Sequence, residues 1–395
     1  MLKKMFRHYD YSIVVPVLLL SGFGLLMVYS SSIYWAIKAS HPADFFFKHQ
    51  LLNLMAALIA FGFAMIFPYK AYKKLMKFIL FACLLSLVIV IFFSQLTNGA
   101  HSWISIGGFN FQPSEFAKIG LIIYLAAVFS NKQHYISNFS RGVVPPLVII
   151  VVTFVLIALQ PDLGTAMIVA GTAGVMICCS GMRTKHLAGL LALAGVSVAL
   201  LFSVMLSGEQ GSRFAAAYAP FKHPEAGYQT INSYIAIASG GITGQGLGQG
   251  IEKFGFLPES YTDFIMAIIA EEFGLIGVVL VIGALAYLVF KGFLTGIQCK
   301  DTFGSLLAIG ISGLLGVQAI INLGVVCGLV PTTGVPLPFI SYGGSALVLF
   351  MFSMGILVNI SMFVRWKREK PNEEEMDVPT SSYQPRSYVK GITHR

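Results

Sequence analysis

Charged residues are scarce in this chain. Asp, Glu, Lys and Arg make up 11% of its 395 residues and hydrophobic residues make up 56%, whereas a soluble domain carries about 25% charged residues. This composition excludes an ordinary soluble domain and predicts a polytopic membrane protein. Because a spanning helix needs roughly 20 apolar residues, the apolar windows predict an all-α fold of ten spans, at about residues 12–33, 49–67, 78–96, 114–130, 143–159, 165–180, 187–206, 264–290, 303–327 and 340–364.

Cysteine is also rare, and its positions argue against a disulfide framework. The five cysteines lie in or beside predicted spans, so we interpret them as small buried side chains: Cys83, Cys178, Cys179, Cys299 and Cys327. The first apolar run is too long for the hydrophobic region of a signal peptide and has no clear small-residue cleavage site. We therefore expect no cleaved leader.

The motifs of several common enzyme classes are missing. The glycine-rich run Gly244–Gly250 has neither the preceding strand nor the Lys-Ser/Thr pair of a nucleotide-binding loop. The eight histidines are scattered without metal-ligand spacing, so no dedicated zinc site is predicted. No Gly-x-Ser-x-Gly nucleophile motif is present.

Basic residues are unevenly distributed along the chain, whose net charge is +9. If both termini are cytoplasmic, seventeen Lys and Arg residues fall in the inner segments and five in the outer loops. This pattern follows the positive-inside rule and requires an even number of spans. We therefore expect a multi-pass protein of the cytoplasmic (inner) membrane with both termini inside, and we attribute the positive charge to topology and not to nucleic acid.

Three outer stretches are long enough to carry chemistry: 97–113, 207–262 and 328–339. All three fall on the same face of the membrane. The expected organisation is a membrane domain over residues 1–364, with 207–262 as a large extracellular loop, and a cytoplasmic tail over 365–395. The tail has almost no apolar residues and should be disordered; it is either a docking tail or a plain solvated tail.

Acidic side chains mark the membrane boundary, where charge is costly and usually functional. Asp263 opens a predicted span directly after the large loop, and Glu271 and Glu272 lie about 12 Å deeper at about 1.5 Å per residue. Helix capping competes as an explanation for Asp263. We favour catalysis or substrate contact for Asp263, and structural or pKa-tuning roles for the deeper pair.

Other polar and aromatic residues at the outer boundary have two interpretations each. Glu115 and Lys118 share a helix face and form either a functional ion pair or one that only organises packing. Asp162 either caps the sixth span or has a further role. Trp103 is first an interfacial aromatic and second a ligand-stacking residue. The stretch 334–339, with Pro336 and Pro338, is expected to be a rigid, extended, re-entrant segment.

Four groups of motifs together resemble the SEDS family (shape, elongation, division and sporulation) of polytopic peptidoglycan glycosyltransferases. The resemblance extends from about residue 10 to residue 365. The motifs are Gly99–Ile104 with Gln112–Lys118, Gln160–Thr165, Gly240-Gly241 through Phe256–Glu259 and Thr262–Ile265, and Pro331–Pro338 with Ser341–Ser345. Asp10-Tyr11 and Met27–Ser32 favour the FtsW-type branch, which includes SpoVE, over the RodA-type branch. Many members carry Arg where this chain has Ser102.

The resemblance implies a protein of ten spans that polymerises lipid II outside the cytoplasmic membrane. The essential aspartate of the family maps onto Asp263, and its Glu and Lys on the fourth span map onto Glu115 and Lys118. We expect Asp263 to act as the general base that deprotonates the acceptor 4-hydroxyl. A second carboxyl is not required, because undecaprenyl diphosphate is a good leaving group, unlike that in glycoside hydrolysis.

The diphosphate needs cations, for which Lys118, Arg213 or a divalent metal (Mg or Mn) are candidates. Further candidate substrate-binding residues are Trp103, Gln112, Glu259, Thr262, Ser341 and Gly343. Family membership implies a class B penicillin-binding transpeptidase as partner, with other divisome or elongasome proteins, besides lipid II and the nascent glycan strand. The alternative functions are a lipid II flippase or proton-coupled carrier, a RodA-type elongation polymerase, and a scaffold.

Overall fold

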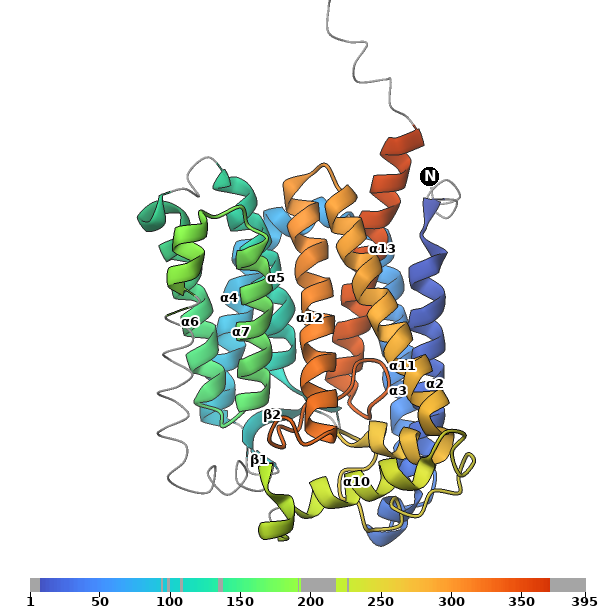
Figure 1. Ribbon diagram of the computed structural model, residues 1–395. Coiled ribbons are helices and arrows are strands. Elements are labelled where there is room, and N and C mark those ends of the chain that lie inside the picture. The colour runs from blue at the N-terminus through green and yellow to red at the C-terminus, as the bar shows by residue number, and fades with distance from the viewer. Residues whose placement is uncertain are drawn as a thin grey trace, which may run out of the picture.

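The computed structural model describes residues 8–93, 95–97, 100–106, 109–133, 138–190, 192, 218–225 and 227–369. Within these residues the protein is mostly helical, and the long helices run side by side in one bundle (Figure 1). The α-helices are α2 (Tyr11–Lys38), α3 (Phe45–Ile66), α4 (Tyr69–Phe93), α5 (Pro113–Asn131), α6 (Val144–Ala158), α7 (Leu163–Cys178), α10 (Tyr228–Gly240), α11 (Ile265–Gln298), α12 (Thr302–Val326) and α13 (Gly344–Glu369). Two short helices of other types are η2 (Phe139–Val143) and η3 (Pro220–Lys222).

Seven of the described helices are long and apolar enough to cross a membrane, and α6 and α7 are shorter apolar helices. Nine of the ten predicted windows overlap one of these helices. The window predicted at 187–206 lies mostly outside the described residues. The protein is therefore a multi-pass helical membrane protein.

Helix α5 lies at the centre of the bundle, with 83% of its most apolar window buried, whereas α4 lies at the periphery with 11%. Peripheral helices expose large apolar side chains such as Ile59 and Phe78, as expected where a helix faces lipid. Close packing in the interior depends on small residues. A Cβ atom at Gly355 of α13 would lie 2.6 Å from the backbone oxygen of Phe61 in α3.

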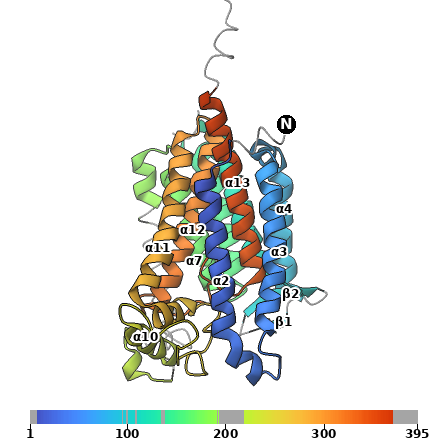
Figure 2. The same ribbon diagram turned by 90° about the vertical axis from the view of Figure 1, so that its right-hand side faces the viewer.

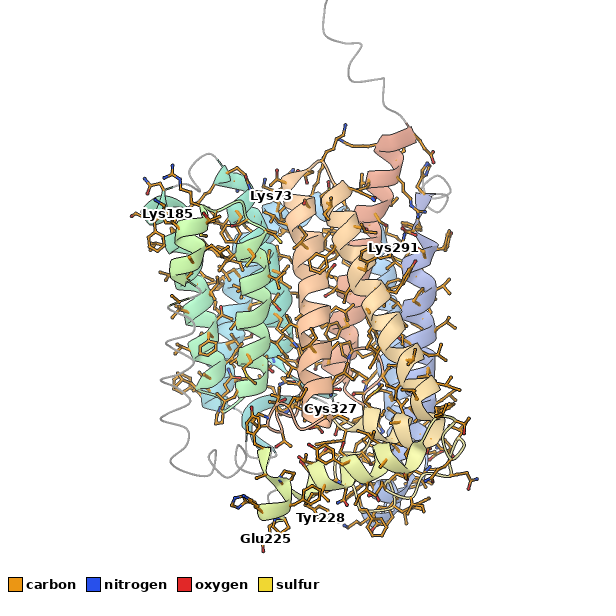
Figure 3. All side chains as sticks on the ribbon, in the orientation of Figure 1. Lys73, Lys185, Glu225, Tyr228, Lys291 and Cys327 are labelled. Carbon is orange, nitrogen blue, oxygen red and sulfur yellow. The ribbon has the colours of Figure 1, made fainter. Side chains whose placement is uncertain are left out.

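Both described ends of the chain lie at the same end of the bundle. His8 Nε2 lies 2.9 Å from Glu369 Oε2. Asp10 caps α2 through Ser12 and also pairs with Arg365 of α13 at 2.7 Å. Helix α13 continues to Glu369, beyond the tail boundary expected at 365. Figure 3 shows Lys73, Lys185 and Lys291 at this end of the bundle and Glu225, Tyr228 and Cys327 at the other.

A small antiparallel sheet, which the all-α expectation omitted, connects α4 to α5 at the opposite end. Its strands are β1 (Gln95–Thr97), β2 (Ala100–Ile106) and β3 (Phe109–Phe111), in the order β1-β2-β3. Trp103 pairs with Gln95 and Ile104 with Phe111. Aromatic and β-branched residues favour strands, but strands of three residues are too short to give a clear alternating pattern in the sequence.

Helix α10 lies across the same end of the bundle as the sheet (Figures 1 and 2). The chain that follows it runs along a kink in α11, where Gly274 has φ 63° and ψ −160°. The kink frees backbone groups of α11, and the passing chain satisfies them. Gln245 N donates to Glu271 O at 3.0 Å, and Leu275 N donates to Gly241 O at 3.0 Å. A kink at this depth is tolerated because its backbone groups remain hydrogen-bonded.

Candidate active site

Asp263 lies immediately before α11, at the end of the loop that follows α10. It is 6% exposed. The N-cap residue of α11 is Phe264, and no side chain caps this helix. The alternative that Asp263 is only a helix cap is therefore wrong. Its Oδ1 atom accepts a hydrogen bond from Thr262 Oγ1 at 3.1 Å.

Asp263 is held in an environment that favours its protonated form near neutral pH. Burial, and secondarily the charge of Glu259, raise the pKa of Asp263 to about 7, while the Thr262 hydroxyl and the backbone N–H of Gly334 partly oppose the shift. The Thr262 hydroxyl also lies 2.6 Å from Glu259 Oε2. Because a hydroxyl has one proton to donate, Thr262 is shared between the two carboxylates. A carboxylate with a pKa near the working pH suits general base catalysis.

Two buried amides of α12, Gln318 and Asn322, connect Asp263 to the rest of the site. Asn322 Nδ2 donates to the backbone oxygens of Asp263 and Val335, both at 2.8 Å. Gln318 Nε2 donates to Pro336 O at 3.0 Å. The sequence reasoning missed both residues, although two amides four residues apart in an otherwise apolar span were a usable signal.

The ion pair expected on α5 is present and fully buried. Lys118 Nζ lies 2.7 Å from Glu115 Oε1 and 2.8 Å from Gln318 Oε1. The ring of Phe350 lies 5.8 Å from the same ammonium group. Glu115 Oε2 has no hydrogen-bond partner within the described residues. The buried ammonium is thus fixed by two oxygen acceptors, and Gln318 links it to the segment that Asn322 holds.

The segment between α12 and α13 enters the bundle. Val335, Leu337 and Ile340 are buried, and a Cβ atom at Gly24, in the middle of α2, would lie 2.6 Å from Ile340 Cα. This agrees with the re-entrant segment expected for 334–339. Pro336 and Pro338 lie in the stretch without regular secondary structure, where Pro336 supplies the carbonyl bound by Gln318.

Ser341 and Gly343 hold this segment in place. Ser341 Oγ donates to Thr262 O at 2.5 Å and accepts from Leu337 N at 2.8 Å. Gly343 N donates to Gln50 Oε1 at 3.4 Å. The loop that carries Asp263 and the segment after α12 are therefore bonded to each other directly as well as through Asn322.

Gln112 and Asp162 form a second junction at the same end of the bundle. Asp162 caps α7 by accepting from Thr165 N at 3.0 Å, as the sequence indicated, and its other oxygen accepts from Gln112 Nε2 at 3.1 Å. Trp103 lies on β2 with its side chain partly buried. Arg213 lies outside the described residues.

Glu271 and Glu272 contact the loop and not Asp263. Glu271 Oε1 accepts from the backbone N–H of Ile251 at 2.6 Å. Glu272 Oε1 pairs with Lys253 Nζ at 2.5 Å and accepts from Ser30 Oγ at 2.7 Å. Their geometry is that of anchors for the loop between α10 and α11. The carboxylate charge that raises the pKa of Asp263 comes from Glu259, so tuning of Asp263 by the deeper pair has no support in the structure.

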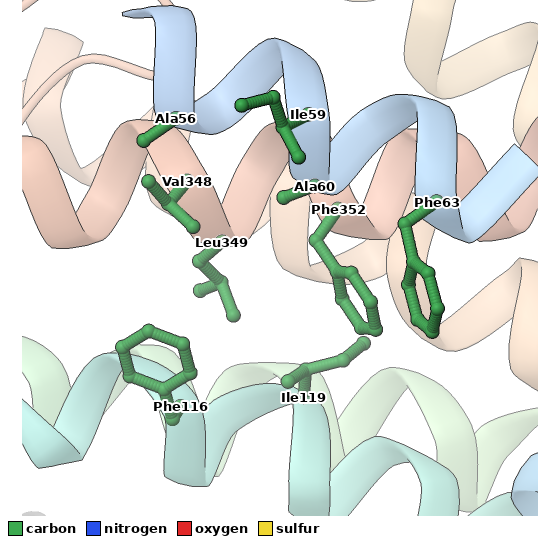
Figure 4. Close-up of a pocket in the computed structure, with 9 residues that line it drawn as sticks. All are labelled: Ala56, Ile59, Ala60, Phe63, Phe116, Ile119, Val348, Leu349 and Phe352. Carbon is green, nitrogen blue, oxygen red and sulfur yellow. The ribbon is translucent and has the colours of Figure 1, made fainter. Parts of the chain in front are cut away.

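An apolar groove of about 440 Å³ lies between α3, α5 and α13 (Figure 4). It is lined by hydrocarbon side chains alone: Ala56, Ile59, Ala60, Phe63, Phe116, Ile119, Val348, Leu349 and Phe352. Phe116 and Ile119 follow Glu115 and Lys118 in the sequence, so α5 presents different faces to the groove and to the buried ion pair. A groove of this composition accommodates hydrocarbon and offers nothing to a sugar or phosphate.

The described residues offer no preformed cluster of metal ligands. They contain no group of three or more His, Cys, Asp or Glu side chains placed to hold an ion. The divalent cation stays a prediction.

Comparison with known proteins gives consistent matches over nearly the whole chain. The family model FTSW_RODA_SPOVE, described as "Cell cycle protein", matches residues 11–366. The chain is 49% identical to the probable peptidoglycan glycosyltransferase FtsW of Bacillus subtilis (strain 168), covering 95% of this chain and 96% of that protein. It is 40% identical to stage V sporulation protein E of the same organism, covering 90% and 98%.

Two solved structures share the fold. One belongs to work described as structural coordination of polymerization and crosslinking by a peptidoglycan synthase complex; it has a TM-score of 0.73, 26% identity, and coverage of 90% of this chain and 98% of that chain. The other is the rod shape determining protein RodA of Thermus thermophilus, with a TM-score of 0.65, 26% identity, and coverage of 89% and 96%. By its sequence and its fold, this chain belongs to the FtsW/RodA/SpoVE family.

Proposed function

We propose that this protein is a peptidoglycan glycosyltransferase of the FtsW type, which polymerises lipid II into glycan strands for septal wall synthesis. The names of its relatives support the activity. The observation that carries the mechanism is the placement of Asp263: a buried carboxyl with a pKa near 7, held through Asn322 at the same segment that Gln318 connects to a buried lysine.

In this mechanism Asp263 is the general base. It accepts the proton of the acceptor sugar's 4-hydroxyl as that oxygen attacks the anomeric carbon of the donor strand. The bond from the anomeric carbon to the diphosphate oxygen breaks, and undecaprenyl diphosphate leaves with the bonding electrons. Thr262 orients the carboxylate, and burial together with the charge of Glu259 keeps the pKa of Asp263 high. No cationic side chain lies within ion-pair distance of Asp263 among the described residues, so its basicity is retained.

Lys118 supplies positive charge for the substrate diphosphate, and Arg213 is a second candidate. Support for Lys118 comes from its burial and its fixed position between Glu115 and Gln318. Trp103 and Gln112 stay candidates for substrate contact at the rim. The geometry of Ser341 and Gly343 favours holding the loop over touching the substrate.

The polyprenyl tail of lipid II occupies the apolar groove between α3, α5 and α13. Each CH₂ group transferred from water to such a surface contributes about 0.8 kcal/mol, but a membrane lipid already lies in hydrocarbon. The groove therefore orients the tail more than it adds affinity.

The membrane arrangement is ten spans with both termini in the cytoplasm and the Asp263 site on the outer face. Residues 1–364 form the membrane domain and 207–262 the large outer loop; the tail expected over 365–395 lies, beyond Glu369, outside the described residues. Support comes from the adjacency of residues 8 and 369 and from the lysines at that end of the bundle. The partner is a class B penicillin-binding transpeptidase, an assignment supported by the similarity to a peptidoglycan synthase complex.

The test is polymerisation of lipid II by the purified protein with its transpeptidase partner. Asp263→Asn should lower the rate by at least about 100-fold. Asp10→Asn is the matched control, because Asp10 is also buried but lies at the opposite end of the bundle; it should retain activity. Normal polymerisation by folded Asp263→Asn would sink the mechanism, and transport of lipid II without polymerisation would favour the carrier alternative.

A further inference from the structure

Gln318 and Asn322 lie one helical turn apart on α12, and both are 0% exposed. Their side chains reach three separate parts of the chain: the loop before α11, the segment after α12, and α5. The partners of Asn322 are 59 and 13 residues away in the sequence, and the Lys118 partner of Gln318 is 200 residues away. These two amides therefore join elements that local sequence does not bring together.

Packing alone does not explain an amide at either position. A buried amide without partners is costly in an apolar interior, and a leucine or methionine would fill the same volume at no such cost. Asn322 uses both of its N–H donors on backbone carbonyls, and Gln318 uses its donor and its acceptor on different partners. The hydrogen bonds are thus the property that these positions provide.

Asn322 holds the backbone of Asp263 and the backbone of the segment after α12. It binds the carbonyl of Asp263 itself and that of Val335. The residue before Val335 is Gly334, whose backbone N–H lowers the pKa of the Asp263 carboxyl. Loss of the Asn322 amide would therefore release the backbone of the base and the segment that follows Gly334.

Gln318 acts on the cation in the same way. Its Oε1 atom accepts from Lys118 Nζ, while its Nε2 atom is fixed by the carbonyl of Pro336. Pro336 follows Val335 in the chain, so both amides hold one short segment. The Lys118 ammonium and the Asp263 backbone are therefore both linked, through these amides, to the adjacent residues Val335 and Pro336.

We propose that Gln318 and Asn322 are positioning residues for the polymerisation reaction: Asn322 fixes Asp263 for proton transfer, and Gln318 aims Lys118 at the substrate diphosphate, both through the Val335–Pro336 segment. This inference rests on the proposed function. Neither amide touches the substrate in this scheme. Each acts through the residue it holds, so the two should affect different steps of the reaction.

The experiment is steady-state lipid II polymerisation by the full-length protein with its transpeptidase partner, measured from pH 5.5 to 9. Asn322→Ala should lower kcat at least about 30-fold with KM changed by less than about threefold, because proton transfer is impaired. Its acidic limb should also move to lower pH, because burial is the largest contribution to the raised pKa of Asp263 and its relief outweighs the loss of the Gly334 N–H. Gln318→Met should raise KM at least about fivefold and leave the acidic limb unchanged.

The position of the acidic limb depends on the groups around Asp263. Glu259, from the same loop, contributes charge to the Asp263 carboxyl, and the segment after α12 contributes the Gly334 N–H. Glu115 and Lys118 of α5 reach the segment through Gln318. A shift of the limb in Asn322→Ala and not in Gln318→Met therefore reports on Asp263.

Asn359→Ala is the matched control. Asn359 is equally buried and also joins two backbone groups, Tyr69 N and Met65 O, but at the opposite end of the bundle. It should lose stability without a change in kcat, KM or pH profile per folded molecule. If Asn322→Ala folds poorly, Asn322→Ser keeps one donor and should give an intermediate kcat.

The outcomes separate the inference from the function on which it rests. Inactive wild-type protein, or full activity of Asp263→Asn, contradicts the proposed function. The positioning roles alone are overturned by a different result. In that result the wild type is active, Asp263→Asn is inactive, and the Asn322 and Gln318 variants match Asn359→Ala in every kinetic constant. A kcat effect at Asn322 with a KM effect at Gln318 supports them.

Discussion

Asp263→Asn should stabilise the protein at alkaline pH while it removes activity. The wild-type carboxyl is buried without a cationic partner among the described residues, so ionising it opposes folding. Its pKa rises from 3.8 to about 7 on folding. At about 1.36 kcal/mol per pKa unit, the full effect is about 4 kcal/mol. The substituted amide is neutral at every pH and avoids this cost.

The sign of the effect follows from proton linkage. The folded state binds the Asp263 proton more tightly than the unfolded state, so wild-type stability falls as pH rises from about 4 to about 7. Over the two pH units from pH 5 to pH 7, the wild-type free energy of unfolding falls by about 3 kcal/mol. The stabilisation by Asp263→Asn should therefore be about 3 kcal/mol larger at pH 8 than at pH 5. The assay is unfolding of the purified protein in detergent at both pH values.

Asp10→Asn is the control with the opposite expectation. Burial alone would raise the pKa of Asp10, but the Ser12 hydroxyl and the charges of Arg365 and Lys291 outweigh it and hold the pKa below its usual value. A depressed carboxyl pKa contributes stability above the unfolded value, so Asp10→Asn should destabilise at both pH 5 and pH 8. Equal stabilisation by Asp263→Asn at the two pH values would refute the reasoning, because the buried charge would then not be its cause.

Three further predictions concern the surroundings of the site. Thr262→Val removes a hydroxyl that lowers the pKa of Asp263, so the acidic limb of the polymerisation rate should move to higher pH; an unmoved limb would show that the hydroxyl does not bond the base. Lys253→Met leaves Glu272 buried without its cation and should cost about 3–5 kcal/mol, with recovery in the Lys253→Met/Glu272→Met double variant, measured by limited proteolysis of the loop; additive losses would contradict the coupling. Ile119→Trp narrows the groove and should raise KM about tenfold for lipid II with a full-length tail and not for a short-chain analogue; equal effects on both would exclude the tail site.

Local patterns were sufficient for several parts of the site. Glu115 and Lys118 pair because residues three apart share a helix face, and Asp162 caps α7 because an Asp before an apolar run accepts from the N–H three residues on. Helix windows followed from apolar length alone. In each case the interaction lies within one element, so the sequence around it contains the relevant information.

Long-range contacts account for what was missed. The rise of the helix correctly placed Glu271 and Glu272 farther along the chain into α11, beyond Asp263. The loop after α10 folds back, however, and binds both carboxylates. Gln318 and Asn322 were overlooked because three of their four partners are backbone carbonyls, which every residue has and no sequence pattern marks. A buried amide in a span indicates that a partner exists without saying which one.

A charged lysine and a neutral amide would have different consequences for a general base beside them. Lys118 and Lys253 are buried, and each is paired with a glutamate. A lysine at ion-pair distance from Asp263 would favour the ionised carboxylate and depress its pKa by about one to three units. This lower pKa would weaken Asp263 as a base near neutral pH. The fold instead holds Asp263 by its backbone carbonyl, through the neutral amide of Asn322. This arrangement fixes the position of the carboxyl without adding charge beside it, so precise placement and retained basicity are compatible in one buried residue.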